Sequence, residues 1–146
     1  MKHALLFLVG LLFSSFCQGT IDERYLDPSL PIDKRVRILM RQMTLEEKVA
    51  QLCQYVGLQY GRKDKPIAFE STDPDTLIRS LLESNGIARN ISLGKVGACL
   101  HVYSVEEANI LQRIARKSWL RIPLLIAIDA IHGNCMHRGC TVYPTS

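Results

Sequence analysis

The second half of the chain alternates an apolar segment, a helical pattern and a second apolar segment. Residues 94–102 are a short, mostly apolar stretch, and residues 124–128 are a continuous apolar run. Between them, Ser104 and Glu107 form a capping box ahead of apolar residues at helical spacing. Continuous apolar runs are typical of strands covered on both faces, as in parallel sheets with helices outside. The pattern predicts a βαβ unit with a right-handed crossover.

The first half predicts helices rather than strands. Over residues 32–43, apolar residues recur at helical spacing with charged residues between them. Thr44 and Glu47 form a capping box for a second short helix that runs to about Cys53. We therefore expect a helical hairpin, followed by a polar loop over residues 57–71.

A third helix is expected after that loop. Asp73-Pro74 has the pattern of an N-cap followed by proline at the first helical position, and Asn85-Gly86 marks the end. Asn90 begins an Asn-Ile-Ser glycosylation sequon, and its glycine and polar neighbours favour a surface loop.

The first 19 residues have the three-part layout of a secretory signal peptide. Lys2 gives a positive start, residues 4–13 are mostly apolar, and Cys17 and Gly19 are small residues before a cut after Gly19. The apolar run is too short to span a bilayer, which takes about 20 residues. We expect removal of residues 1–19 and a secreted or periplasmic domain over residues 20–146, with no membrane partner after cleavage.

Export changes how the cysteines are interpreted, because oxidising compartments allow disulfides. The mature chain would keep Cys53, Cys99, Cys135 and Cys140, and Cys135–Cys140 is the most local pairing. His132 and His137 lie in the same loop, so a zinc site is an alternative. Structural zinc sites usually separate their two ligand pairs by a longer stretch, which favours the disulfide.

Other function classes lack their sequence signals. The basic residues are scattered, with no sustained basic tract and interleaved aromatics, so we expect no nucleic-acid partner. The sequence also has no Gly-rich phosphate loop, Gly-x-Ser-x-Gly elbow or His-Glu-x-x-His motif.

Asp129 directly follows the apolar run of residues 124–128. In parallel α/β folds the carboxyl ends of the strands face the binding site, so this position favours contact with a ligand. A carboxylate there can accept hydrogen bonds from adjacent sugar hydroxyls. The alternative is that Asp129 caps the following turn. His132 either donates to the ligand, orients Asp129 or is a structural histidine.

Four blocks of the sequence resemble motifs of glycoside hydrolase family 3. Residues 43–52, Met-Thr-Leu-Glu-Glu-Lys-Val-Ala-Gln-Leu, resemble the family's opening motif. Residues 94–112 resemble its first strand and helix, and residues 122–133 are very similar to its strand ending in Asp-Ala-Ile-His-Gly. Residues 138–144 resemble the segment that follows. The blocks occur in the family's order and extend from about Tyr25 to the end of the chain.

The resemblance implies an α/β fold, the partial N-terminal portion of a TIM-like (β/α)8 barrel preceded by the helical hairpin. It implies a retaining hydrolase that releases terminal non-reducing β-D-glucose or xylose from glucosides or oligosaccharides, without a cofactor. The family's Asp-Ala-Ile-His-Gly aspartate binds hydroxyls of the terminal sugar, and this role falls on Asp129. His132 and Arg138 would be neighbours of the site.

The sequence also departs from the family's pattern. The family's nucleophile and acid/base blocks lie further along than Ser146, so the chain would be an inactive fragment with two strands of a barrel of about 250 residues. Open apolar strands predict aggregation. His101 stands where the family commonly has a smaller amide residue. The alternative function is a catalytically inactive secreted carbohydrate-binding or interaction module.

Overall fold

The computed structural model describes residues 21–62 and 65–130. The described chain divides into two compact units, with the boundary between Gln42 and Met43. The predicted signal peptide, residues 1–19, lies outside the described residues. The two helices predicted as a hairpin fall in different units, so both helices are confirmed and their pairing stays a prediction.

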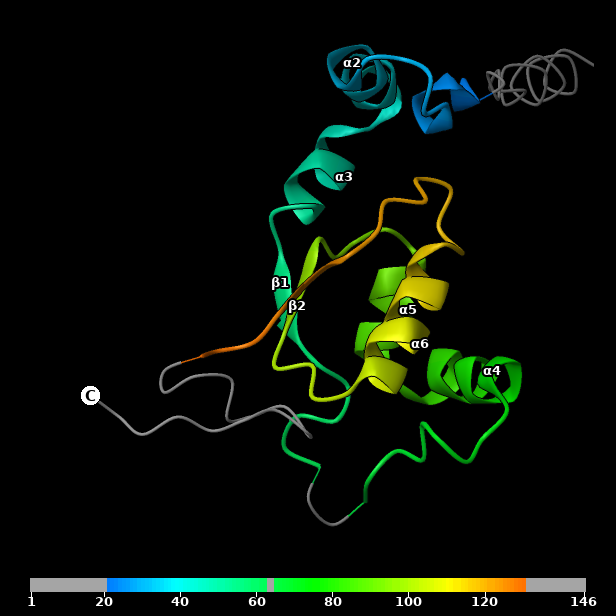
Figure 1. Ribbon diagram of the computed structural model, residues 1–146, viewed down its shortest axis with the longest axis vertical. Helices are drawn as coiled ribbons and strands as arrows, with labels where there is room; N and C mark the ends of the chain where they lie inside the picture. The colour runs from blue at the N-terminus through cyan, green and yellow to red at the C-terminus, as the bar shows by residue number, and fades with distance from the viewer. Residues whose placement is uncertain (1–20, 63–64, 131–146) are drawn as a thin grey trace, which may run out of the picture. The chain divides into compact units, whose positions relative to one another are not determined.

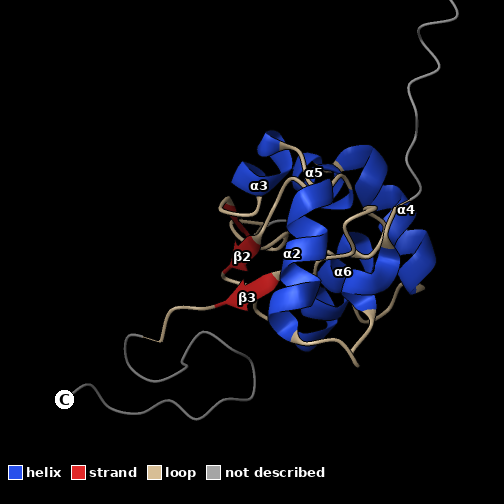
Figure 2. Cartoon of the chain, turned by 90° about the horizontal axis from the view of Figure 1, so that it is seen from above, coloured by secondary structure: helices blue, strands red, loops and turns tan. Residues whose placement is uncertain are grey.

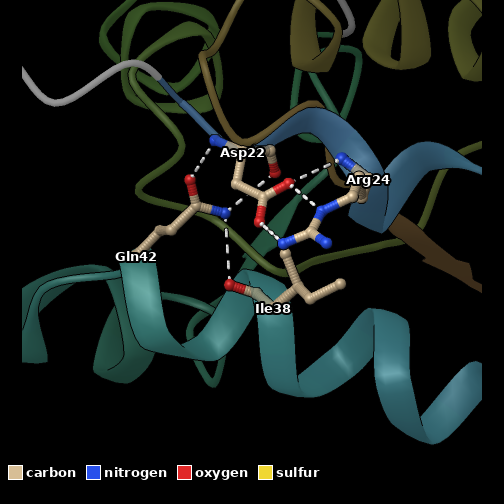
Figure 3. A network of polar contacts seen from close by, with 4 residues as sticks. All are labelled: Asp22, Arg24, Ile38 and Gln42. Atoms are coloured by element: carbon tan, nitrogen blue, oxygen red, sulfur yellow. Dashed lines mark hydrogen bonds and ion pairs between the residues drawn. The ribbon is translucent and has the colours of Figure 1, made fainter.

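The first unit contains a short 3-10 helix, η1 (Glu23–Leu26), and helix α2 (Ile32–Gln42). The Gln42 side chain joins them: its oxygen accepts from the Asp22 amide at 2.6 Å, and its nitrogen donates to the Asp22 and Ile38 carbonyls at 3.1 Å (Figure 3). The Asp22 carboxylate accepts from the Arg24 guanidinium, and this contact lowers the pKa of Asp22 to about 2. The network anchors the start of the unit to the last turn of α2.

The second unit begins with helix α3 (Leu45–Ala50), which confirms the predicted capping box. The Glu47 amide donates to the Thr44 hydroxyl at 3.2 Å, and the Thr44 amide donates to the Glu47 carboxylate at 2.8 Å. The other oxygen of Glu47 accepts from the Trp119 indole at 2.5 Å, which ties α3 to a segment 72 positions later in the chain. The helix ends at Ala50, earlier than expected.

Three short strands form one parallel sheet in the order β1-β2-β3: β1 (Gln54–Val56), β2 (Ala98–Leu100) and β3 (Leu125–Ala127). Tyr55, Cys99 and Ile126 lie opposite one another across the sheet. The predicted strand–helix–strand unit is confirmed as β2, helix α6 (Val105–Ala115) and β3. The sequence did not predict β1, because its three residues carry no apolar run.

Helix α4 (Pro74–Ser84), helix α5 (Gly86–Ser92) and α6 lie on one side of the strands, as both views show (Figures 1 and 2). Their apolar residues and those of β2 form the core of this unit. Its most buried members are Ala88, Ile91, Cys99, Val102, Leu111 and Ile114.

Two expectations about exposure are wrong. Leu125 and Ile126 in β3 are 73% and 38% exposed; their side chains point to opposite faces of the sheet, so the described residues do not cover β3 on both faces. Asn90 lies half-buried inside α5 rather than in a surface loop. The reason is that Asn85 starts a new helix directly after α4, with its side-chain oxygen accepting from the Ile87 and Ala88 amides.

In the part of the chain that is described, no helix combines the length and apolar character needed to cross a membrane.

Candidate functional site

Four polar or aromatic side chains meet beyond the carboxyl ends of the three strands. Tyr60 follows β1, His101 and Tyr103 follow β2, and Asp129 follows β3. Because the strands are parallel, the loops that follow them leave the same edge of the sheet. Ring contacts and a polar contact between His101 and Asp129 bring these side chains together, and we call the four residues the edge cluster.

The three rings of the edge cluster lie nearly parallel. The ring centroids of Tyr60 and His101 are 4.9 Å apart with an angle of 11° between the planes. The Tyr103 ring lies 6.2 Å from His101 and 6.5 Å from Tyr60, at 21° and 20°. Offset stacking at such spacings is favourable and holds ring orientations. The stack therefore packs the imidazole against one ring from the loop after β1 and one ring from its own loop.

His101 faces Asp129 across the sheet edge. Its Nε2 lies 3.7 Å from the Asp129 Oδ2, with the histidine side chain 14% exposed and the aspartate side chain 48% exposed. The His101 Nδ1 is buried and has no hydrogen-bond partner among the described residues. His101 also has a φ of 58°, in the left-handed region that is uncommon for residues other than glycine. Sequence reasoning noted His101 only as a departure and did not place it beside Asp129.

Asp129 lies just beyond β3, where its place in the sequence predicts it, and its accessible carboxylate is part of the edge cluster. Within residues 21–62 and 65–130, no main-chain amide donates to this carboxylate. The amides of the following turn lie after residue 130, outside the described residues, so the turn-capping alternative stays a prediction.

A cavity of about 490 Å³ lies next to the edge cluster. Its walls are the segment 66–71 together with Gln59, Tyr103, Ser104 and Glu107. The volume is within the range of small-molecule sites. Asp129 does not line this cavity, and Tyr103 is the residue that belongs to both features. The accessible face of Asp129 and the cavity are therefore two adjacent parts of one loop surface.

Glu107 is a buried carboxylate that sequence reasoning assigned wrongly. The Ser104 half of the predicted capping box is confirmed, because the Glu107 amide donates to the Ser104 hydroxyl at 3.1 Å. The Glu107 carboxylate does not return to the cap; it accepts from the Gln59 amide at 3.0 Å and the Tyr103 amide at 3.3 Å. These donors belong to the loops after β1 and β2, so Glu107 joins the two loops that carry the rings.

Burial raises the pKa of Glu107, and the backbone amides of Gln59, Tyr103 and Leu58 offset only part of that rise. The surrounding backbone is packed closely. A Cβ on Gly57 would lie 2.6 Å from the His101 carbonyl oxygen and 2.8 Å from a Glu107 carboxylate oxygen. No sequence signal distinguishes this buried role of Glu107 from the capping box, since both use the same residue spacing.

The remaining predicted site residues fall outside the described part of the chain. These are His132, Arg138, the Cys135–Cys140 pair and, for the zinc alternative, His137. In the described segments, no group of three or more histidine, cysteine, aspartate or glutamate side chains is placed to hold a metal ion. Cys99 is buried, and this burial raises the pKa of its thiol to about 11, whereas Cys53 is exposed.

No protein-family model matches the sequence, and no curated protein matches it significantly. The resemblance to glycoside hydrolase family 3 therefore stays an expectation based on the four sequence blocks.

Proposed function

We propose that this chain provides the first part of a β-glycoside hydrolase, in which Asp129 holds the terminal non-reducing sugar by its hydroxyls. One observation carries the proposal: an accessible carboxylate lies directly beyond β3, where the loops of three parallel strands meet. The loops beyond the carboxyl ends of parallel strands are where such folds bind their ligands.

The strand order supports the barrel part of the proposal. Successive strands of a (β/α)8 barrel are neighbours in the sheet, with their helices outside. A doubly wound sheet instead reverses its strand order at a switch point and has helices on both faces. The order β1-β2-β3, with α4, α5 and α6 on one side, agrees with the beginning of a barrel (Figure 1).

The chemistry of the edge cluster suits a sugar. Small-molecule sites combine aromatic walls with a few polar groups that fix the orientation of the ligand. Asp129 supplies acceptor oxygens for hydroxyls, and the three rings supply aromatic surface beside it. A retaining mechanism also needs a nucleophile and an acid/base. We assign neither role to Asp129; in the family that the sequence resembles, both residues come from later blocks.

The second candidate is a carbohydrate-binding module without hydrolytic activity. It is favoured by the single accessible carboxylate in the edge cluster, because Glu107 is buried and bonded to backbone amides. The coding sequence after the Ser146 codon separates the two. A reading frame that continues into the family's nucleophile and acid/base blocks supports the hydrolase, and a stop codon supports the module.

Asp129→Asn tests the sugar contact. A hydrogen bond to a charged acceptor contributes about 1.5–3 kcal/mol, so the substitution should weaken binding of methyl β-D-glucoside or xyloside by roughly 10- to 100-fold. The thermal midpoint should change by less than about 2 °C, because the side chain is half exposed. Calorimetric titration and thermal unfolding measure the two effects.

Asp75→Asn is the matched control, since Asp75 is an exposed carboxylate in the first turn of α4. This variant should bind as the wild type does. Equal sugar affinity in the Asp129 and Asp75 variants, or no sugar binding by the wild type, contradicts the proposed sugar contact.

A further inference from the structure

We propose that His101 is a positioning residue, which uses its Nε2–H to hold the Asp129 carboxylate in the orientation that receives a sugar. Its effect on sugar binding rests on the proposed function, whereas the contact between the two side chains can be tested without any ligand. The proposal combines the placement of the ring, its tautomer, its stacking and the conformation of its backbone.

The sheet brings the side chains of His101 and Asp129 together. His101 is the first residue after β2, and Asp129 follows the neighbouring strand β3. The Nε2–Oδ2 distance of 3.7 Å is longer than a hydrogen bond of 2.7–3.2 Å. Polar contacts in unliganded sites are often long and shorten when the ligand binds. We expect this contact to shorten when a sugar binds to Asp129.

The buried Nδ1 selects the tautomer. In the Nδ1–H tautomer, a buried N–H group would have no acceptor among the described residues, which is costly. In the Nε2–H tautomer, the buried Nδ1 carries only a lone pair, which needs no acceptor. The proton is then on Nε2, the nitrogen that faces Asp129. The geometry therefore favours the tautomer that donates towards the carboxylate.

Stacking and backbone conformation hold the ring in this orientation. Tyr60 and Tyr103 lie nearly parallel to the imidazole and come from two different loops. The φ of 58° at His101 is a strained conformation for a residue with a Cβ, and it persists only where the surroundings impose it. The close approach of Gly57 to the His101 carbonyl is one such constraint. One oxygen of Asp129 then faces the imidazole, and the other is available to hydroxyls.

The first test observes the tautomer directly. Long-range ¹H–¹⁵N spectra of the imidazole groups identify which nitrogen carries the proton, and the His101→Asn variant assigns the signals. Asparagine tolerates the left-handed region, so this variant removes the ring with little backbone strain. We expect the Nε2–H tautomer in the wild type and a mixture of tautomers in Asp129→Ala. An Nδ1–H tautomer, or a spectrum that Asp129→Ala leaves unchanged, overturns the proposal.

The second test measures sugar binding. His101→Asn should weaken the binding of methyl β-D-glucoside by roughly 3- to 10-fold, because the Asp129 carboxylate loses the one hydrogen bond that holds its orientation. Arg121→Asn is the matched control, because Arg121 is also left-handed, with a φ of 47°, and precedes β3 at the opposite edge of the sheet. This control should bind as the wild type does; an unchanged affinity in His101→Asn contradicts the positioning role.

The two tests fail independently. If the wild type binds no sugar but its tautomer responds to Asp129→Ala, the proposed function is wrong and the contact between His101 and Asp129 stands. If sugar binds through Asp129 while the tautomer is insensitive to that residue, the proposed function stands and the positioning role of His101 is wrong.

Discussion

At the scale of single residues, Glu107 shows how one carboxylate organises two loops. It is 1% exposed and accepts from the Gln59 and Tyr103 amides, which belong to loops that sequence places 44 positions apart. An amide buried without an acceptor costs about 1–3 kcal/mol. The orientation of the rings in the edge cluster therefore depends on a carboxylate that bonds the backbone of the loops that carry them.

Replacing Glu107 by alanine should lower the free energy of unfolding by about 1–3 kcal/mol, because both amides lose their acceptor. Urea-induced unfolding measures this loss. Glu106→Ala is the control, since Glu106 lies in the same turn and is only partly buried. A Glu107 variant as stable as the Glu106 variant contradicts the role of Glu107 as a link between loops.

Glu107 should also make stability depend on pH. Its pKa is higher in the folded chain than in the unfolded chain, because burial disfavours the charged form. Its contribution is therefore complete below the unfolded pKa, about 4.3, and declines as the pH rises through the raised value. The stability of the wild type relative to Glu107→Gln should fall over this window. A constant difference in the free energy of unfolding between the wild type and Glu107→Gln from pH 4 to 8 would show that burial does not raise the pKa of Glu107.

At the scale of elements, glycine sets how closely the segment before β2 approaches the end of α3. A Cβ on Gly97 would lie 1.8 Å from the Gln51 carbonyl oxygen, far inside van der Waals contact. The Gly97 backbone also takes part in the sheet, since its amide donates to Cys53 and its carbonyl accepts from Leu125. The clash is with backbone, so no side-chain rotation relieves it.

Gly97→Ala should therefore destabilise the second unit by about 3 kcal/mol, the upper end of the range for overpacking. Gly86→Ala is the matched control, because Gly86 begins α5 and nothing lies within 4 Å of the position that a Cβ would take. The control should be neutral or stabilising by up to about 1 kcal/mol, since alanine favours a helix more than glycine does. Thermal unfolding compares the two variants. Similar thermal midpoints would contradict the close approach of Gly97 to the Gln51 carbonyl.

At the scale of the whole molecule, the described sheet has an uncovered edge at β3. Leu125 is 73% exposed although it lies within a strand. Exposed apolar strand edges pair with other chains, and natural proteins commonly protect such edges with lysine. We expect the chain to associate with itself through this strand at high concentration.

Leu125→Lys should shift the chain towards monomer, because a charge on β3 opposes edge pairing. Leu93→Lys is the control: Leu93 is 52% exposed but lies at the end of α5 and belongs to no strand. Sedimentation velocity over a range of concentrations measures the association. Equal self-association of the two variants would exclude β3 as the contact surface.

Local signals in the sequence determined helices α2, α3, α4 and α6 and two of the three strands, whereas helix α5 and strand β1 were not predicted. Thr44, Asp73 and Ser104 each accept from an amide in the first helical turn, as their spacing predicts. These interactions join residues three positions apart, so a short stretch of sequence contains all that they need. The position of Asp129 beyond a strand is predictable for the same reason, since it follows an apolar run.

Tertiary structure alone decided the features that join distant segments. Strand β1 exists because it pairs with β2, more than forty positions later, and the carboxylate of Glu107 reaches a loop 48 positions away. The contact between His101 and Asp129 likewise requires two neighbouring parallel strands. Such contacts depend on where the folded backbone places each segment, and no local pattern of residue types contains that information.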